Sequence, residues 1–400
     1  MSSNPRQRQG ATSVRNGLDQ MVAQDFEGLT GKRFGVLCNQ ATVDSSGTHL
    51  LSHLAARNLS PTVIFSPEHG LWSTHQDMEA VEGTQDPIFR MPVISLYGAA
   101  LDTLSPAQQH LDRLDLLVAD LPDIGTRYYT YAATVVRCLA VAAGTGTEVL
   151  LLDRPNPIDG VTLEGGPPHP SLRSFVGELT VPHRHGMTLG ELAEMANRDL
   201  QCKLTIEPVQ GWNRRQYGDE SGAFGVPPSP NMPTIETAIV YPGMCLLEGT
   251  NVSEGRGTTT PFMVCGAPWV KAHELATAIR RELPNCGAIV TPAAFRPEFQ
   301  KCAKEVCRGL RIRVTDRSRF HSLAFGIAVV KWLYHLHPGD FEWRSQEYEF
   351  VRDKLAIDLL FGNLQPRIML ERGDKVQDIV ALLERSLPEF GKVRGEVVRY

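Results

Sequence analysis

The sequence predicts an α/β protein in which a doubly wound, mainly parallel sheet is followed by a smaller C-terminal α/β domain. In the first half, short and almost continuously apolar segments alternate with segments of helical periodicity. Apolar character on successive residues is typical of strands that are covered on both faces. A chain of 400 residues also exceeds what one hydrophobic core usually serves. We therefore expect two domains, 14–235 and 236–400.

The first domain is expected to alternate strands with helices. A glycine at position 146 predicts the end of the second helix. Thr188 followed by Glu191 has the spacing of a capping box and predicts the start of the third. The expected strands are 33–39, 62–66, 92–98, 114–121, 148–153 and 203–209, and the expected helices are 47–58, 129–146 and 186–200.

The second domain is expected after a proline-rich junction. Residues 225–243 hold five prolines, which is typical of a connection between domains. Beyond it we expect helices at 273–283 and 323–337, a strand at 309–316 and a C-terminal pair of helices.

The composition of the chain argues against several classes of function. A net charge of −5 with scattered Lys and Arg argues against binding to nucleic acid or to an anionic membrane. No apolar run approaches the ~20 residues that span a bilayer, and the polar N-terminus lacks the apolar middle of a secretory signal. The eight cysteines are dispersed without a CxxC pair, which favours free thiols in a reducing cytoplasm. No GxGxxG motif follows the first strand, so no dinucleotide cofactor is expected.

Four loops concentrate polar side chains. The carboxyl ends of parallel strands open into a crevice, so we expect most of these loops to meet near the domain junction and form a cleft for a polar ligand. The four groups are Glu68 with His69; Asp120 and Asp123 with Arg127, Tyr128 and Tyr129; His183 with His185; and Glu248, Asn251, Glu254 and Arg256.

Each group also has a purely structural explanation. Asp120 can accept N–H bonds at the start of the next helix, and the tyrosines can fill the core. His183 and His185 would hold a metal only with a third ligand, and no HExxH motif accompanies them. No metal is therefore expected.

Carboxylates, aromatic residues and an arginine, without a phosphate loop or a nucleophile elbow, suit glycoside hydrolysis. That reaction requires a protonated carboxyl group at the leaving oxygen and a second group at the oxocarbenium-like centre. Two alternatives stay open: a sugar-binding protein without catalysis, and a metal hydrolase that uses His183 and His185.

Several motifs in consecutive order resemble the exo-β-N-acetylmuramidase family, long a family of unknown function. The resemblance runs from about Gly17 to beyond Trp269. The matching segments are GKRFGVLCNQATVDSSGTHLL, SPEHG, RYYTY, LDRPNPIDG, SFVGELTVPHRHGMTLGELA, PSPNMPT and YPGMCLLEGTNVSEGRGTTTPF.

This resemblance implies a Rossmann-like N-terminal domain without a dinucleotide, a smaller C-terminal domain and a cleft between them. It also implies that the protein releases terminal N-acetylmuramic acid from the non-reducing end of peptidoglycan-derived glycans. Glu68 occupies the position of the family's proposed catalytic glutamate, as general acid/base, with Asp120 or Glu254 as the candidate second carboxylate. The candidate substrate-binding residues are His69, Asp123, Arg127, Tyr129, Asn156, His183, His185, Asn231 and Arg256.

Two segments depart from the family's pattern. Pro122 stands where the family usually has glutamine, and residues 71–74 lack the arginine that the family tends to have after its PEHG turn. These differences keep the non-catalytic sugar-binding protein open as the alternative.

Overall fold

The larger of two sheets is formed by the first half of the chain. The computed structural model describes residues 14–81, 83–222 and 224–400. Within this part of the chain, the larger sheet has six parallel strands and one antiparallel edge strand, β3. In chain order the strands are β1 (Phe34–Leu37), β2 (Val63–Ser66), β3 (Thr84–Gln85), β4 (Pro92–Ser95), β5 (Leu116–Ala119), β6 (Glu148–Leu152) and β7 (Leu204–Glu207).

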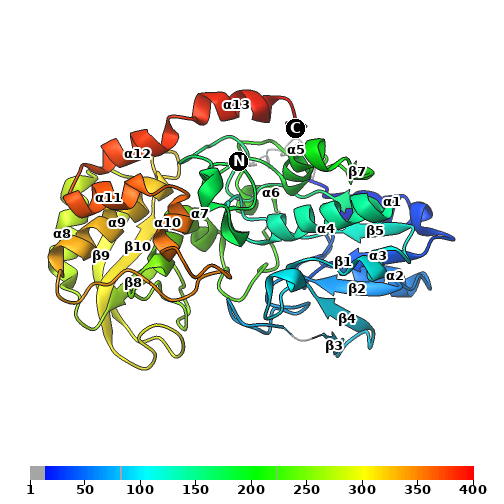
Figure 1. The fold of residues 1–400 in the computed structure, drawn as a ribbon, viewed down its shortest axis with the longest axis horizontal. Coiled ribbons are helices and arrows are strands. Elements are labelled where there is room, and N and C mark those ends of the chain that lie inside the picture. The colour runs from blue at the N-terminus through cyan, green and yellow to red at the C-terminus, as the bar shows by residue number, and fades with distance from the viewer. Residues whose placement is uncertain (1–13, 82, 223) are drawn as a thin grey trace, which may run out of the picture.

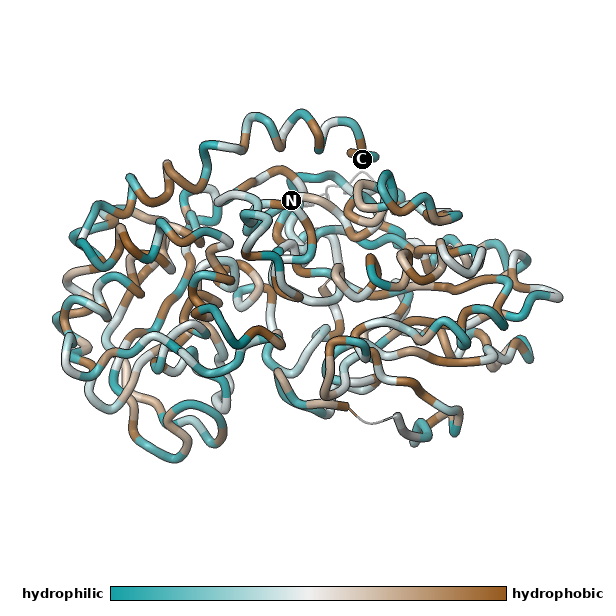
Figure 2. The backbone as a smooth tube through the Cα atoms, in the orientation of Figure 1, coloured by the Kyte–Doolittle hydropathy of each residue, from teal (hydrophilic) through white to brown (hydrophobic). Residues whose placement is uncertain are grey.

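The strand order is that of a doubly wound sheet. It reads β3-β4-β2-β1-β5-β6-β7, so the chain builds outward from β1 in one direction and then returns to build from β5 in the other. A ligand crevice is expected outside the carboxyl ends of the strands at this reversal. Every residue of β1, β2 and β5 is buried, and Figure 2 shows hydrophobic residues along the strands of this sheet. The predicted Rossmann-like architecture is confirmed.

Helices cover this sheet and begin close to the predicted positions. Thr188 and Glu191 form the predicted capping box at the start of α5, and Gly146 ends α4 in the left-handed conformation. The helices of this half are α1 (Gly17–Ala23), α2 (Leu50–Ala56), α3 (Gln108–Leu111), α4 (Tyr131–Thr145), α5 (Leu189–Leu200) and α6 (Gly218–Ser221), with short 3₁₀ turns η1 (Glu27–Leu29), η2 (Leu101–Leu104), η3 (Pro170–Leu172) and η4 (Phe175–Gly177).

The second half of the chain forms a smaller lobe around an antiparallel sheet (Figure 1). Its strand order is β8-β10-β9, with β8 (Val264–Ala267), β9 (Ala288–Phe295) and β10 (Cys307–Val314). The 3₁₀ helix η5 (Cys245–Gly249) follows the first helix of this lobe. The helices are α7 (Ile235–Met244), α8 (Ala272–Glu282), α9 (Ser322–Leu336), α10 (Ala356–Phe361), α11 (Gln365–Arg372), α12 (Val376–Glu384) and α13 (Leu387–Gly395). Among the described residues, no helix has the length and apolar character needed to cross a membrane.

Two glycines bring α7 and α9 into close contact. A Cβ added at Gly326 would lie 2.0 Å from the carbonyl oxygen of Gly243. The Gly243 N–H donates to the Ser322 hydroxyl over 2.9 Å, and that hydroxyl donates to the carbonyl of Val240 at the same distance. Pro242 lies inside α7 and supplies no N–H of its own. The two helices therefore meet backbone to backbone.

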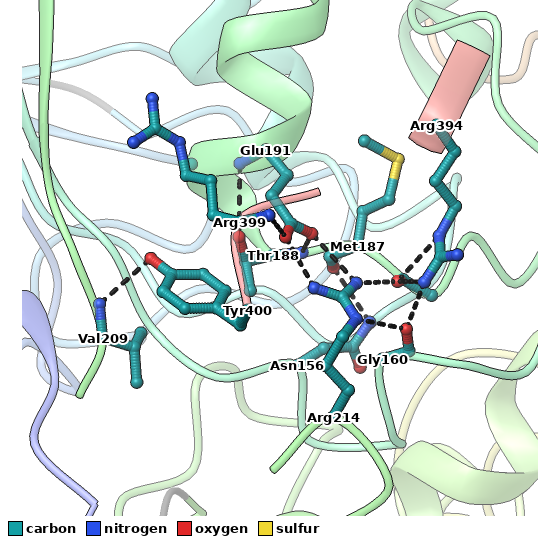
Figure 3. A network of polar contacts seen from close by, with 12 residues as sticks. Asn156, Gly160, Met187, Thr188, Glu191, Val209, Arg214, Arg394, Arg399 and Tyr400 are labelled. Atoms are coloured by element: carbon teal, nitrogen blue, oxygen red, sulfur yellow. Dashed lines mark hydrogen bonds and ion pairs between the residues drawn. The ribbon is translucent and has the colours of Figure 1, made fainter. Parts of the chain in front are cut away.

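The C-terminal helix α13 returns to the first half of the chain and is fixed there by polar contacts (Figures 1 and 3). Arg394 donates to the carbonyls of Gly160 and Gly186. The Tyr400 hydroxyl donates to Asp153 over 2.8 Å, and the N–H of Arg399 donates to Glu191 over 2.8 Å. The last helix thus holds the smaller lobe against the larger one.

Candidate active site

A tight turn after β2 places Glu68 inside the protein. His69 and Gly70 both have left-handed backbones, with φ of 71° and 80°, and this conformation turns the chain back at the strand end. Glu68 is only 5% exposed. The Glu68 side chain therefore faces the interior and not bulk solvent.

Glu68 is held at the N-terminal end of α4. The hydroxyl of Thr130, which immediately precedes the helix, donates to Glu68 Oε2 over 2.6 Å. The N–H of Met78 donates to Oε1 over 3.3 Å. These two donors fix the orientation of the Glu68 carboxyl group.

Glu68 lines a small, partly open cavity between the two halves of the chain. Its volume is about 40 Å³, compared with roughly 10–15 Å³ needed to hold one water molecule. Carboxylates and aromatic side chains dominate the wall. The lining residues are Glu68, His69, Asp77, Tyr128, Tyr129, Thr130, Val176, Ser229, Asn231, Met232, Tyr241, Glu248, Arg256, Phe262, Tyr348 and Glu349.

Arg256 neutralises part of this acidic wall. Its Nη2 donates to Glu248 over 2.7 Å and its Nη1 donates to Glu254 over 2.8 Å. Its Nε lies 3.1 Å from Asp77 Oδ1 as an ion pair, without the alignment of a hydrogen bond. The guanidinium carbon lies 4.8 Å from the centre of the Phe262 ring. The pair with Asp77 is the loosest of the three.

A second, more open cavity adjoins the first. It has a volume of about 460 Å³ and shares Asp77, Glu248 and Arg256 with the inner cavity. Its outer wall includes polar and aromatic side chains suited to a hydrated ligand: Asn251, Gln300, Lys301, Trp343 and Arg344. The three shared residues therefore lie between a small inner cavity and a wider vestibule.

The structure brings five of the predicted site residues to the inner cavity: Glu68, His69, Tyr129, Asn231 and Arg256. His69 Nδ1 lies 3.1 Å from the carbonyl oxygen of His75, which orients the ring. The Asn231 amide donates to Gln76 over 2.9 Å. Both contacts hold the polar wall to the loop that follows β2.

The two predicted second carboxylates lie elsewhere. Asp120 is fully buried and accepts from Arg154 Nε over 2.5 Å and from Nη2 over 2.8 Å. Glu254 lines the vestibule and pairs with Arg256 and Lys301. Burial alone would raise the pKa of Glu254, but these two cations outweigh it and lower the pKa to about 2. Neither group reaches the inner cavity, because each is held by cations of the fold.

Arg127 and His183 are also placed outside the cavity. Arg127 donates to the carbonyls of Gly166 and Leu360, each over 2.6 Å, and so joins the two halves. Burial lowers its pKa to about 10. Its Nη2 lies 3.2 Å from His183 Nε2, and burial together with this cation lowers the pKa of His183 well below its ordinary value.

Asp123, His185 and Asn156 maintain loop structure. His185 Nε2 lies 3.3 Å from Asp123 Oδ2, which also accepts the N–H of Gly125 over 2.6 Å. The Asn156 amide donates to the carbonyl of Met187 over 2.9 Å. The described residues contain no cluster of three or more His, Cys, Asp or Glu side chains arranged to hold a metal ion.

Comparisons with known proteins assign the whole chain to one family. Residues 34–236 match the family described as exo-beta-N-acetylmuramidase NamZ, N-terminal, and residues 239–400 match the C-terminal counterpart. A Bacillus subtilis (strain 168) protein named peptidoglycan beta-N-acetylmuramidase NamZ is 37% identical over 391 residues, which are 97% of this chain and 91% of that protein. The chain belongs to the exo-β-N-acetylmuramidase NamZ family.

Solved structures agree with this assignment. Crystal structures of two DUF1343 family proteins from Bacteroides fragilis NCTC 9343 superpose with TM-scores of 0.83 and 0.74, at 28% and 29% identity. In both cases the match covers 97% of this chain and 99% of the other. The two-lobed arrangement is therefore shared with other chains of this fold.

Within this NamZ-family chain, several cavity residues escaped the sequence analysis. Glu248 was noted only as part of a polar loop, although Arg256 and the Tyr348 hydroxyl both bind it, each over 2.7 Å. Glu349 was missed altogether. It lies in the segment EYEFV, where alternating polar and apolar residues give no sign of a buried carboxyl group.

Proposed function

We propose that this protein is an exo-acting glycoside hydrolase that releases terminal N-acetylmuramic acid from the non-reducing end of peptidoglycan-derived glycans. The family's description and the name of the B. subtilis relative support this activity. The observation that carries the proposal is the buried Glu68 carboxyl group, which faces a small cavity with further carboxyl groups on its wall. Glycoside hydrolysis requires such a pair of carboxyl groups beside the scissile bond.

The two cavities support action at a chain end. Once the walls of the inner cavity have moved apart to admit it, a terminal sugar would lie beside Glu68, and the remaining glycan would lie in the vestibule. The inner cavity is much the smaller of the two, which favours a single terminal sugar beside Glu68 over an internal one.

We propose that His69, Tyr129 and Asn231 bind hydroxyl and acetamido groups of the terminal sugar, since all three line the inner cavity. Arg256 is the candidate partner for the sugar's lactyl carboxylate. A substrate carboxylate would compete with Asp77, whose pair with Arg256 is the loosest and whose side chain is 19% exposed. Arginine can bind a carboxylate through two parallel donors.

We further propose that the chain divides into two domains near residues 235 and 236, which agrees with where the two family matches meet. We propose the cytoplasm as its compartment, because the eight cysteines are free thiols. Free buried thiols are typical of a reducing environment.

The test is turnover of a chromogenic β-N-acetylmuramic acid glycoside by wild type and Glu68→Gln. We expect the substitution to lower kcat by roughly 10²–10⁴-fold, the usual contribution of a proton-transferring group. Glu79→Gln is a matched control, because Glu79 lies on the following loop with an exposed side chain. Equal turnover by Glu68→Gln and wild type would remove Glu68 from the mechanism.

A further inference from the structure

The segment that carries Glu349 has an unusual backbone. Tyr348 and Val351 exchange two backbone hydrogen bonds of 3.0 Å, so Glu349 and Phe350 occupy the two central positions of a tight turn. Both have positive φ, 45° and 66°, which is the pattern of a type I′ turn that glycine, asparagine and aspartate dominate. Residues with larger side chains persist in this conformation only when the surrounding structure holds them.

The surrounding contacts direct Glu349 into the inner cavity. Its side chain is 6% exposed and lines the same cavity as Glu68. The Tyr97 hydroxyl donates to Glu349 Oε2 over 3.1 Å. The Phe350 ring packs edge-on against Tyr97, with 5.9 Å between ring centres. One tyrosine thus fixes both residues of the strained turn, and Oε2 of Glu349 accepts its hydrogen bond.

Glu349 and Glu68 differ in their electrostatic surroundings. Burial, followed by the nearby charges of Glu68 and Glu248, raises the pKa of Glu349 well above its ordinary value. Arg256, the cation of this wall, is engaged by Asp77, Glu248 and Glu254. Glu68, in contrast, accepts from the Thr130 hydroxyl at the start of α4 and from the backbone N–H of Met78 in the loop after β2.

We propose that Glu349 is the proton donor to the leaving group and that Glu68, on the same cavity, accepts the proton of the attacking water. This assignment rests on the proposed function. The two groups come from different halves of the chain and meet in one cavity. Glycoside hydrolysis requires one carboxyl group that donates a proton and a second that accepts one.

With this assignment, every proton in the reaction has a donor and an acceptor. As the bond between the anomeric carbon and the bridging oxygen breaks, the electron pair goes to that oxygen, which takes the proton from Glu349. A water molecule adds to the anomeric carbon and loses a proton to Glu68. One proton transfer from Glu68 to Glu349, through solvent, restores the resting state.

The first test compares two substrates that differ in leaving group. A nitrophenol can leave as its anion without a proton, whereas the oxygen of a sugar leaving group must be protonated. Loss of the acid should therefore slow cleavage of the disaccharide more than cleavage of the nitrophenyl glycoside. We expect Glu349→Gln to lower kcat on a MurNAc-GlcNAc disaccharide by roughly 10²–10⁴-fold and on nitrophenyl β-MurNAc by less than about tenfold. Glu68→Gln should impair both. Glu347→Gln, two residues away and paired with Arg352 near the surface, should impair neither.

The outcomes separate the two proposals. Equal losses on both substrates, or no loss, in Glu349→Gln would overturn the role of Glu349 while leaving the activity intact. A wild-type protein that cleaves neither substrate would overturn the proposed function and this inference with it.

A second measurement does not depend on turnover. The infrared difference spectrum of wild type minus Glu349→Gln, recorded at neutral pH, should contain the carbonyl band of a buried protonated carboxyl group. Carboxylate bands in its place would show that Glu349 is ionised and would contradict the assignment. Thermal unfolding of the same variant reports whether the fold is retained.

Discussion

At the scale of single residues, the partners of a buried carboxylate determine what it can do. Glu68 and Asp120 both follow parallel strands of the same sheet. Glu68 accepts from a hydroxyl and an N–H beside a cavity. Asp120, in contrast, has no exposed surface and accepts two hydrogen bonds from Arg154. The first arrangement leaves a carboxylate available to a substrate, and the second uses it to fix a loop.

We therefore expect Asp120→Asn to reduce stability and not catalysis. The substitution leaves Arg154 without its charged partner in a buried position, at a cost of about 1–3 kcal/mol. Thermal or urea unfolding of the variant should report this loss.

Turnover by the same variant, corrected for the folded fraction, should stay within a few-fold of wild type. A drop comparable with that of Glu68→Gln would instead return Asp120 to the list of catalytic groups.

The sequence located the cavity residues that belong to local motifs. Glu68 and His69 follow a strand end, and Arg256 lies in a glycine-rich loop, so their neighbourhood along the chain marks them. Glu349 has no such mark in its neighbourhood along the chain, because the hydrogen bond that holds it comes from Tyr97 in the other half. Arg127 and His183 lie outside the cavity, and the sequence could not place them, because a polar side chain in a motif looks the same whether it contacts a ligand or backbone carbonyls.

At the scale of elements, the strands with continuous apolar residues were predictable and the others were not. All six parallel strands were expected. Three of them, β1, β2 and β5, are buried throughout, and such strands stand out in the sequence as continuous apolar segments. In contrast, β8 and β9 were missed. β9 contains Pro292 and mixes exposed with half-buried positions, so its pattern resembles a loop. The expected C-terminal pair of helices is in fact the four short helices α10 to α13.

Replacing glycine by alanine should have opposite effects at two helical positions, one inside the contact between α7 and α9 and one outside it. Gly326→Ala would place a methyl group 2.0 Å from the carbonyl oxygen of Gly243, and the helices would have to separate at a cost of about 1–3 kcal/mol. Gly144→Ala, also inside a helix, meets nothing within 4 Å, and should stabilise by about 0.5–1 kcal/mol.

Chemical unfolding of both variants tests this pair. If Gly326→Ala were as stable as wild type, the close approach of the two helices would be wrong. Destabilisation by Gly144→Ala would indicate an unrecognised contact on α4.

At the scale of the whole molecule, charged contacts join the two halves. His321, which precedes α9, lies 3.2 Å from Glu164 of the first half and 2.9 Å from Glu384 of α12. Burial would lower the pKa of His321, but the two carboxylates outweigh it and raise the pKa to about 10. Likewise, burial would raise the pKa of Glu164, but His321 and Arg184 lower it to about 2.

The contribution of His321 to stability should therefore depend on pH. Its pKa is higher in the folded state than the value of about 6.5 for an unfolded chain. The stabilisation is thus fully present below about pH 6.5 and is lost as the pH rises through about 10. The difference in Tm between wild type and His321→Gln should shrink over that range.

His273→Gln provides the control, since His273 is exposed on α8, and its Tm difference from wild type should stay small throughout. A His321→Gln difference that is constant from about pH 6 to 10 would contradict a charged His321 between these two carboxylates.

The size of the inner cavity has a consequence for how a catalytic cycle proceeds. A space of about 40 Å³ holds a few water molecules but is too small for a hexose. Binding of a terminal sugar therefore requires the walls around Glu68 to move apart.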